Sequence, residues 1–382
     1  MLKKTVNPKS MKKENKRVIL RYLVENGPCS RGGVAEKTGL AHSAVWRITD
    51  ELLKEGLIEE KGLMSGKRRK ATVYGPTRSF VTSVIYNVEV METLVAIGYL
   101  DGFWKIVEKF PTPEKFEDFK AAVESSFKTV QSTYPLNVEI SKIVFSVPGM
   151  VNSKEKILIH APNLNWRMID FQKAFKDLEL DVLVENDANL SLFAEHFFSH
   201  DVKESEVSFF LYLGEGIGGA VSVGGNIVRG KDSAAGEIGH VILNLEDLKE
   251  VEYFLSVSRL ISRIEGDTEL DGNSLEEKYH FLKRMWFTGD GNAKKALEHY
   301  LYNMAIVMRN VIYLLNPGII ILGGLINDLW ETFGPYIKRH LERMVEKEIF
   351  TGIIRDTIFK DVPPSLVGGN ILVIEDFLRN LI

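Results

Sequence analysis

Polar residues able to bind a ligand or move a proton gather in short turns that follow β-rich runs. Asn186 and Asp187 follow the run 182–185, and a Gly-rich turn at 214–219 follows the run 207–213. An α/β sheet presents ligand-binding groups in such turns, at the ends of its strands. Taken singly, an Asn or Asp before a helix is more often a helix cap. The order of several such turns is needed to decide between the two interpretations.

A second kind of chemistry is indicated near the N-terminus. Four consecutive cations occupy a loop between the β-rich runs 57–60 and 71–74: Lys67, Arg68, Arg69 and Lys70. Lys and Arg side chains are almost never buried unpaired, so packing does not explain them. Contact with DNA phosphates or the minor groove does. We predict that this loop is the wing of a DNA-binding domain and that binding depends strongly on salt.

Three helices are predicted ahead of this loop. Apolar residues at helical spacing indicate a helix over 15–25. Ser30 is suited to cap a short second helix, and Gly39 is suited to end it in a left-handed conformation. After a tight turn, the segment 42–55 has the apolar spacing of a third helix. Helix, short turn and helix, followed by a hairpin, is the winged helix-turn-helix that reads the DNA major groove.

The third helix is the predicted recognition helix. Its apolar stripe leaves Ser43, Trp46 and Arg47 on other faces, where we expect them to contact DNA. The alternative is a structural helix of a small bundle, with Trp46 packed against a neighbour. Ala41 stands where a polar cap is usual, so the helix start is either shifted or left free for a phosphate.

Charge divides the chain in two. Residues 1–75 contain 17 Lys and Arg and 8 Asp and Glu, and the rest of the chain contains 31 and 44, so a net charge of +9 precedes one of −13. A basic segment joined to an acidic one is typical of a DNA-binding domain attached to a domain that binds another ligand. A basic solvated tail is the alternative.

Composition excludes several other classes. The 382 residues carry a net charge of −4 and are 45% hydrophobic, which suggests two or three globular domains. Cys29 is the single cysteine, so neither an intrachain disulfide nor a Cys-rich zinc site is expected. Neither an apolar run of 18 residues nor a signal-peptide core is present. We therefore expect a cytoplasmic protein.

From residue 80 onward, β-rich runs alternate with helical stretches, which indicates an α/β fold. Six motifs in this part of the chain resemble the ROK family of bacterial sugar kinases and sugar-responsive repressors: Val147 to Gly149, Ala161 to Trp166, Glu185 to Asn189, Leu213 to Gly219, Gly236 to His240 and Asn316 to Gly324. The preceding winged helix-turn-helix makes the chain similar to the repressors, of the xylose-repressor or N-acetylglucosamine-repressor type.

The resemblance implies a winged helix-turn-helix domain at 1–76 and a two-lobed, actin-like (ribonuclease-H-like) domain at 77–382. The first lobe would comprise about 77–185 plus the C-terminal helix, and the second about 186–361. A sugar would bind in the cleft between lobes. The residues that match the family's sugar ligands are Asn163, Asn186, Asp187, Glu237, His240 and, after a shortened loop that leaves its position open, Glu252. Asp187 matches the general base of the kinases.

The chain departs from the family at the phosphate-binding loop. Kinases have Asp-x-Gly-Gly-Thr there, whereas the equivalent segment here is 87–91, with Glu89 and Val90 at the glycine positions. Side chains would crowd a phosphate, and a carboxylate would repel it. Glu215 adds a further negative charge. We therefore expect neither ATP nor magnesium as cofactor, and interpret Gly216, Gly218, Gly323 and Gly324 as turn and packing glycines rather than nucleotide ligands.

The family's zinc loop is also missing, since no thiol follows His240, and we predict no structural zinc. The sequence thus predicts a regulator, most simply a repressor, that binds operator DNA as a homodimer or tetramer and responds to a sugar. An ATP-dependent sugar kinase of glucokinase or N-acetylglucosamine kinase type is the alternative, in which Asp187 would be the active base. A DNA-binding protein that senses nothing is the third possibility.

Overall fold

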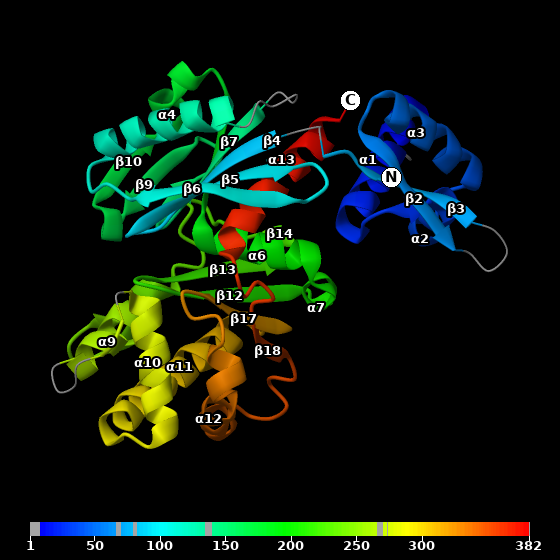
Figure 1. Ribbon diagram of the computed structural model, residues 1–382. Coiled ribbons are helices and arrows are strands. Elements are labelled where there is room, and N and C mark those ends of the chain that lie inside the picture. Colours follow the sequence, from blue (N-terminus) through cyan, green and yellow to red (C-terminus); the bar gives the residue numbers. More distant parts are fainter. Residues whose placement is uncertain are drawn as a thin grey trace.

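The computed structural model describes residues 8–65, 70–78, 82–133, 140–265, 270–272 and 274–381. It consists of a small N-terminal domain, here called the head, beside a body of two stacked lobes (Figure 1). The predicted wing residues Lys67, Arg68 and Arg69 lie outside the described residues, whereas Lys70 lies inside them.

The head begins with α1 (Pro8–Asn26), α2 (Arg31–Thr38) and α3 (His42–Lys54). The caps of α2 are as predicted: Ser30 Oγ accepts from the Gly33 N–H at 3.1 Å, and Gly39 adopts φ +70°. The first helix starts seven residues before its predicted start. The extra residues 8–14 include three lysines and one methionine, good helix formers that extend a helix beyond its apolar stripe.

A three-stranded antiparallel sheet completes the head, in the order β1-β3-β2. The strands are β1 (Cys29–Ser30), β2 (Ile58–Ser65) and β3 (Lys70–Pro76). The predicted hairpin is therefore present, with longer strands than the sequence indicated. The register shifts between Glu60 and Gly62, and Gly62 has φ +125°, so a bulge lets the pairing continue past the glycine.

The first lobe is built on a five-stranded mixed sheet with the order β11-β7-β4-β5-β6. Its strands are β4 (Thr82–Val88), β5 (Glu92–Tyr99), β6 (Trp104–Pro111), β7 (Ile140–Val147) and β11 (Asp181–Asn186). Successive side chains of a strand point to opposite faces. Val84 and Tyr86 accordingly pack in one apolar cluster with α4 (Phe116–Thr133), and Ile85 packs in another with the last helix, α13 (Pro364–Asn380).

Smaller elements join β7 to the last strand of this sheet. They are β8 (Met150–Asn152), β9 (Ile157–Ala161), the 3-10 turn η1 (Pro162–Leu164), β10 (Trp166–Asp170), α5 (Phe171–Ala174) and the 3-10 turn η2 (Lys176–Leu178). The three strands form an antiparallel sheet of their own.

The second lobe repeats the strand order of the first, β14-β13-β12-β17-β18. The strands are β12 (Val207–Leu213), β13 (Ile217–Val223), β14 (Asn226–Ile227), β17 (Ile319–Gly324) and β18 (Ile353–Asp356). In both sheets two antiparallel hairpin partners flank one side of the first strand, and two parallel strands flank the other. This repeated order is the actin-like pattern that the family resemblance implied.

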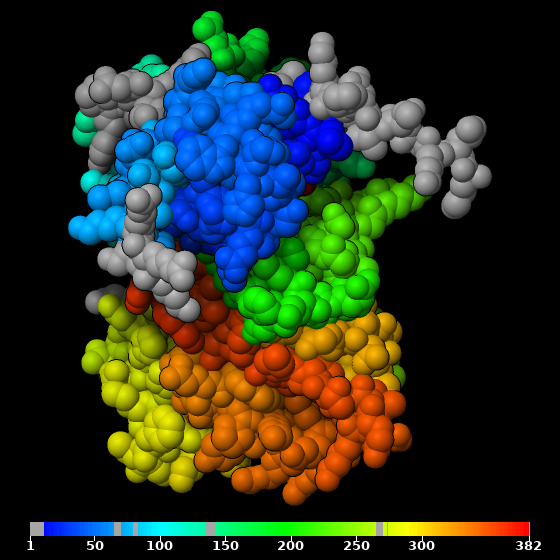
Figure 2. Space-filling view, turned by 90° about the vertical axis from the view of Figure 1, so that its right-hand side faces the viewer, coloured from blue at the N-terminus to red at the C-terminus, as the bar shows by residue number. Residues whose placement is uncertain are grey.

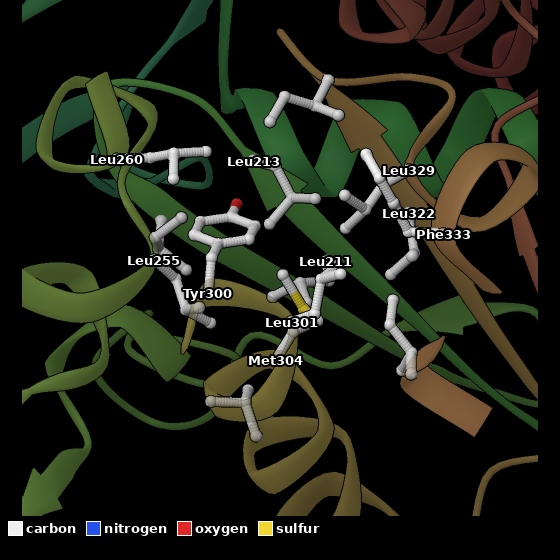
Figure 3. Packing of buried hydrophobic residues seen from close by; sticks show 14 of the residues in the cluster. Leu211, Leu213, Leu255, Leu260, Tyr300, Leu301, Met304, Leu322, Leu329 and Phe333 are labelled. Carbon is white, nitrogen blue, oxygen red and sulfur yellow. The ribbon is translucent and has the colours of Figure 1, made fainter. Parts of the chain in front are cut away.

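Helices cover one face of the second sheet. They are η3 (Ile238–His240), α8 (Val251–Leu255), α9 (Val257–Glu265), α10 (Leu275–Thr288), α11 (Gly291–Leu315) and α12 (Leu329–Met344), with the short hairpin β15 (Ile242–Asn244) and β16 (Lys249–Glu250) between them. Figure 3 shows the core: Tyr300, Leu301 and Met304 of α11 lie against leucines of β12, and all are buried. The buried strands explain the continuous apolar runs that the sequence displays.

Two helices lie between the two sheets and connect the parts of the molecule. Helix α6 (Asp187–Phe198), followed by α7 (His200–Glu204), packs against α13 and against β12 and β13. Helix α13 also packs against the head helix α1. Buried apolar side chains of the head, such as Ile19 and Leu23, form one continuous cluster with Ile374 and Leu378 of α13. Figure 2 shows the blue head seated directly on the body.

Candidate functional site

A cavity of about 870 Å³ opens between the two lobes. Turns from both lobes line it, including the β4–β5 turn, η1, the start of α6 and the β12–β13 turn. All six residues predicted to bind sugar line this cavity: Asn163, Asn186, Asp187, Glu237, His240 and Glu252. The structure thus brings together side chains that lie up to 89 positions apart in the sequence.

The start of α6 supplies two of these residues. Asn186 Oδ1 accepts from the Asn189 N–H at 3.0 Å, so Asn186 caps the helix, and its Nδ2 donates to the Gly149 carbonyl at 3.0 Å. Asp187 Oδ1 accepts from the Ala188 N–H at 2.8 Å. Asn186 therefore has the structural role that its sequence position allowed, while its side chain still faces the cleft.

Asn163 and Glu252 meet at Gly216. A Cβ atom at Gly216 would lie 2.7 Å from Asn163 Nδ2 and 2.9 Å from Glu252 Oε2. The glycine therefore leaves free the space in which the amide of one lobe and the carboxylate of the other converge. Glu252 Oε2 also accepts from the Ile217 N–H at 3.0 Å. The shortened loop before α8 has not displaced Glu252 from the cleft.

Glu237 and His240 lie at either end of η3. Although burial alone lowers the pKa of His240, its Nδ1 lies 3.0 Å from Glu250 Oε2, and this contact gives a net rise in pKa. Burial raises the pKa of Glu237, and the nearby Glu252 raises it further. A partly buried carboxyl beside an imidazole offers both donors and acceptors to a polyol.

The β4–β5 turn, with the end of β4, contains the segment that the family resemblance matched to the kinase phosphate loop. Glu89 and Val90 both line the cavity there. Asn87 holds the turn in place, because its Nδ2 donates to Glu89 Oε1 at 3.2 Å and its Oδ1 accepts from Ser365 of α13 at 2.7 Å. Side chains thus fill a turn in which a phosphate requires close approach to the backbone.

Electrostatics in the cleft favour protonated carboxyls. Burial raises the pKa of Asp187 to about 7, and the charges of Glu89 and Glu237 contribute to the rise. Burial likewise raises the pKa of Glu89 to about 7, with Glu92 and Glu215 adding to it. Like charges in a desolvated site disfavour each other's ionised form. The cleft therefore gathers more carboxyls than it readily ionises together, and a further negative charge would be disfavoured there.

Four glycines were considered for nucleotide binding, and they separate into two pairs. Gly216 and Gly218 line the cavity. Gly323 and Gly324 are not among its lining residues; a Cβ at Gly323 would lie 2.6 Å from Phe210 Cζ, and one at Gly324 would lie 2.7 Å from the Leu213 carbonyl oxygen. These two glycines serve close packing at the end of β17.

Sequence reasoning missed other residues of the cleft, notably Tyr212, Lys109 and Glu276. Burial raises the pKa of Tyr212 well above its ordinary value, and the charges of Glu89 and Asp187 act in the same direction. The signal that could have found Tyr212 is its place two residues before the Gly-rich turn. Lys109 and Glu276 come from β6 and α10, where no local motif marks them.

Among the described residues, the structure contains neither a metal-binding cluster nor a membrane-spanning helix. In the part of the chain that the structure describes, no three His, Cys, Asp or Glu side chains are grouped so that they could hold a metal ion. Within the same ranges, no helix combines the length and apolarity needed to cross a bilayer.

Helix α3 has one face buried in the head and one face exposed to solvent. Val45, Ile48 and Leu52 are buried, whereas Ser43 and Arg47 are exposed on the outer side. The Trp46 side chain is 55% exposed. Its ring therefore lies largely on the surface of the head.

Trp46 nevertheless has a partner within the head. The Arg31 guanidinium lies 4.3 Å from the Trp46 ring centroid and 4.8 Å from that of Tyr74, and it pairs with Asp50 of α3. Arg31 thereby fixes the orientation of Trp46 on the helix surface. Lys70, at the start of β3, is exposed beside the hairpin tip.

The ROK family model matches residues 90–361. The chain belongs to the ROK family. A winged helix-turn-helix DNA-binding model matches residues 12–59, which span α1 to the start of β2. The body is therefore a ROK domain, and the head has the fold of a DNA-binding module.

Relatives of this ROK chain include repressors and kinases. It is 24% identical over 389 residues to the xylose repressor of Bacillus subtilis strain 168, covering 96% of this chain and 97% of that protein. It is 25% identical over 312 residues to the glucokinase of Halalkalibacterium halodurans, covering 75% of this chain and 94% of that one.

Among solved structures, a ROK family transcriptional regulator, described as a homologue of the E. coli MLC protein, superposes with a TM-score of 0.74 at 19% identity. The match covers 97% of this chain and 98% of that one. At this identity the likeness shows the fold, and it extends over head and body together.

Proposed function

We propose that this ROK protein is a sugar-responsive transcriptional repressor. Its head would bind operator DNA, and its cleft would bind a sugar. One observation carries the proposal: a DNA-binding module is packed on a body whose cleft is lined by the residues that the family resemblance assigns to sugar binding, together with Glu89 and Val90 of the segment that it assigns to phosphate binding. Sugar recognition is retained, and nucleotide recognition is lost.

The DNA contacts would come from two parts of the head. Ser43, Trp46 and Arg47 of α3 would lie in the major groove, where exposed side chains of a recognition helix contact base edges. Lys70, with the loop cations Lys67, Arg68 and Arg69, would contact phosphates. Phosphate contacts position a protein on DNA and base contacts give the sequence preference.

The signal would travel along the two helices between the lobes. Asp187 at the start of α6 lines the cleft, and α6 packs along α13. Near its end, α13 carries Glu375, which forms an ion pair with Arg21 of the head helix α1. A sugar that binds both lobes would fix their relative angle and, through α13, the position of the head. The sugar must bind one arrangement more tightly than the other for this to work.

A homodimer or tetramer would convert that movement into a change of DNA affinity. Helix-turn-helix proteins bind two half-sites about 34 Å apart, so a shift of each head changes how well both fit at once. Closed symmetric oligomers are the usual way to present two such heads.

The test is a thermal-shift screen of hexoses, amino sugars and pentoses, followed by operator binding with and without the sugar that stabilises the protein. Glu237→Ala should abolish the sugar response and leave operator affinity unchanged, because Glu237 lies in the cleft and not in the head. Loss of operator binding by Glu237→Ala in the absence of sugar would contradict this assignment. A screen in which no sugar shifts the melting temperature would point to a DNA-binding protein without a sugar effector.

A sugar kinase is the second candidate, and Asp187 is the observation that favours it. Asp187 lines the cleft at the position of the family's general base, with a pKa of about 7 that suits proton transfer near neutrality. A coupled ATP assay on the same sugars distinguishes the two functions. We expect no turnover above background; turnover that disappears in Asp187→Asn would establish the kinase instead.

A further inference from the structure

The charge of the cleft restricts the chemistry of its ligand. Seven carboxyl groups line the described part of the cavity: Glu89, Glu92, Asp187, Glu215, Glu237, Glu252 and Glu276. The basic side chains that line it are Lys109, Lys278 and His240. Lys109 is paired with Glu92 at 3.1 Å, and His240 with Glu250 at 3.0 Å. Among the described lining residues, the acidic groups therefore outnumber the cations that could neutralise them.

Most α-helix N-termini at the cleft, which in many proteins bind phosphate, are unsuited to it here; the start of α9, where Ser258 lines the cavity, is the one in the described ranges without an acidic residue in its first turn. Exposed N–H groups and the positive end of the helix dipole make a helix N-terminus an anion site. Three helices instead place a carboxylate of their own first turn in the cleft: Asp187 of α6, Glu252 of α8 and Glu276 of α10. In α6 the first free N–H groups are also taken, since Ala188 donates to Asp187 and Asn189 donates to Asn186.

Arginine, the residue that binds phosphate in a bidentate manner, is absent from the lining in the described ranges. The nearby Arg229, which enters from the loop after β14, is held by Glu185, a residue only 2% exposed. Glu185 also accepts from Asn189 Nδ2 at 3.0 Å. The Arg229 guanidinium therefore pairs with a carboxylate that holds the start of α6, and it does not line the cavity.

We infer that the effector of this cleft is an uncharged, unphosphorylated sugar and that the cleft rejects phosphorylated and carboxylated forms of the same sugar. The inference rests on the proposed function and narrows it. Neutral hydroxyls can donate to the surrounding carboxylates, whereas a phosphate would meet like charge without a replacing cation. The protein would then report a sugar before any phosphorylation step. Its effector must come from a reaction or transport step that releases the free sugar, and a sugar-phosphorylating enzyme would remove the signal.

The experiment compares matched sugars by calorimetric titration of the full chain: glucose with glucose 6-phosphate and glucuronate, N-acetylglucosamine with its 6-phosphate, and xylose with its 5-phosphate. For the sugar that binds, we expect the anionic forms to bind at least about 100-fold more weakly. Raising the salt concentration should narrow this gap, because screening weakens repulsion between exposed charges.

Substitutions in the cleft can distinguish exclusion of the phosphorylated sugar by charge from exclusion by shape. The double variant Glu215→Gln/Glu276→Gln should reduce the discrimination by at least about tenfold, chiefly by improved binding of the phosphate. Glu277→Gln, one position further along α10 and outside the cleft lining, is the matched control and should leave the ratio unchanged.

Two results would overturn the inference. Tighter binding of a phosphorylated sugar than of its neutral form would do so while leaving the repressor proposal intact. Unchanged discrimination in the double variant would show that shape rather than charge excludes the phosphate. If neither neutral nor anionic sugars bind, the sugar-sensing function itself fails together with the inference.

Discussion

Arg21 of the head and Glu375 of α13, 354 positions apart in the chain, form an ion pair. The Glu375 side chain is 7% exposed, so loss of Arg21 would leave a nearly buried carboxylate without its ion-pair partner. A second pair, between Glu25 of α1 and Lys203 of α7 at 2.9 Å, joins the head to the end of α6. The head is therefore attached to α13 and to α7, which directly follows α6, the helix whose first residue, Asp187, lines the cleft.

Breaking the ion pair between Arg21 and Glu375 should uncouple sugar binding in the cleft from the operator affinity of the head. In Arg21→Glu we expect an unchanged sugar dissociation constant but a sugar-induced change in operator affinity reduced by at least about tenfold, or 1.4 kcal/mol. Fluorescence anisotropy of labelled operator, titrated with and without sugar, measures this. The exchange variant Arg21→Glu/Glu375→Arg should restore much of the response.

Arg17→Glu provides the control for this experiment. Arg17 lies on the same helix and pairs with Glu14 of that helix at 3.1 Å, so it tests charge on α1 without touching the body. A full sugar response in Arg21→Glu would show that the signal does not pass through this contact.

Gly216→Ala should block the sugar site without unfolding the protein. The added methyl group would come within 3 Å of Asn163 and Glu252, in the space between the two lobes. We expect at least about tenfold weaker sugar binding, equivalent to 1.4 kcal/mol, with an unchanged melting temperature in the absence of sugar. Gly291→Ala, where a Cβ would meet nothing within 4 Å, is the control in the same lobe. Normal sugar affinity in Gly216→Ala would place the sugar elsewhere in the cleft.

The raised pKa values of Glu89 and Asp187 make stability depend on pH. Each carboxyl has a pKa of about 7 in the folded protein, against 4.5 and 3.8 in the unfolded chain. Between about pH 4.5 and 7 the folded state holds protons that the unfolded state has lost, so the free energy of unfolding falls as pH rises through this window.

Glu89→Gln should remove part of that dependence. We expect the variant to be about 1–2 kcal/mol more stable than the unsubstituted protein at pH 8 and equal to it near pH 4. Urea unfolding across the pH range measures the difference. Glu155→Gln, at an exposed position outside the cleft, should show no such gain. A gain of equal size at both pH values would indicate improved packing rather than titration.

The wing prediction rests on the sequence, because Lys67, Arg68 and Arg69 lie outside the described residues. Arg68→Ala/Arg69→Ala should weaken operator binding and reduce the slope of log affinity against log salt by about 0.9 for each phosphate that the variant no longer neutralises. Lys128→Ala, an exposed cation on α4 of the body, should leave the slope unchanged. The same slope in the double variant would remove the wing from the interface.

Local signals accounted well for the head and for single elements. Ser30 and Gly39 could be placed because a cap depends on residues a few positions away. Strand β12 has the bounds of the β-rich run 207–213 noted in the sequence. The cleft residues could be named from the order of the family motifs, since that order reflects a shared three-dimensional arrangement.

Long-range partners could not be predicted in this way. The stacking of Arg31 on Trp46, the approach of Glu276 to Glu89 and the pairing of Arg21 with Glu375 each join segments that share no local pattern. Trp46 shows the difference: helical spacing placed it off the buried stripe, but the residue covering its ring comes from another helix.

The return of α13 to the first lobe also affects how the chain can fold. Strands β4 and β7 precede most of the body in the sequence, yet their second apolar face is covered by α13, which is synthesised much later. During translation, α13 cannot cover that face until residues 364–380 have left the ribosome. A nonsense codon shortly before residue 364 would therefore leave the apolar face of the first sheet exposed and the head without its contact on α13. We expect such a truncated protein to misfold or aggregate as a whole, not merely to lose one helix.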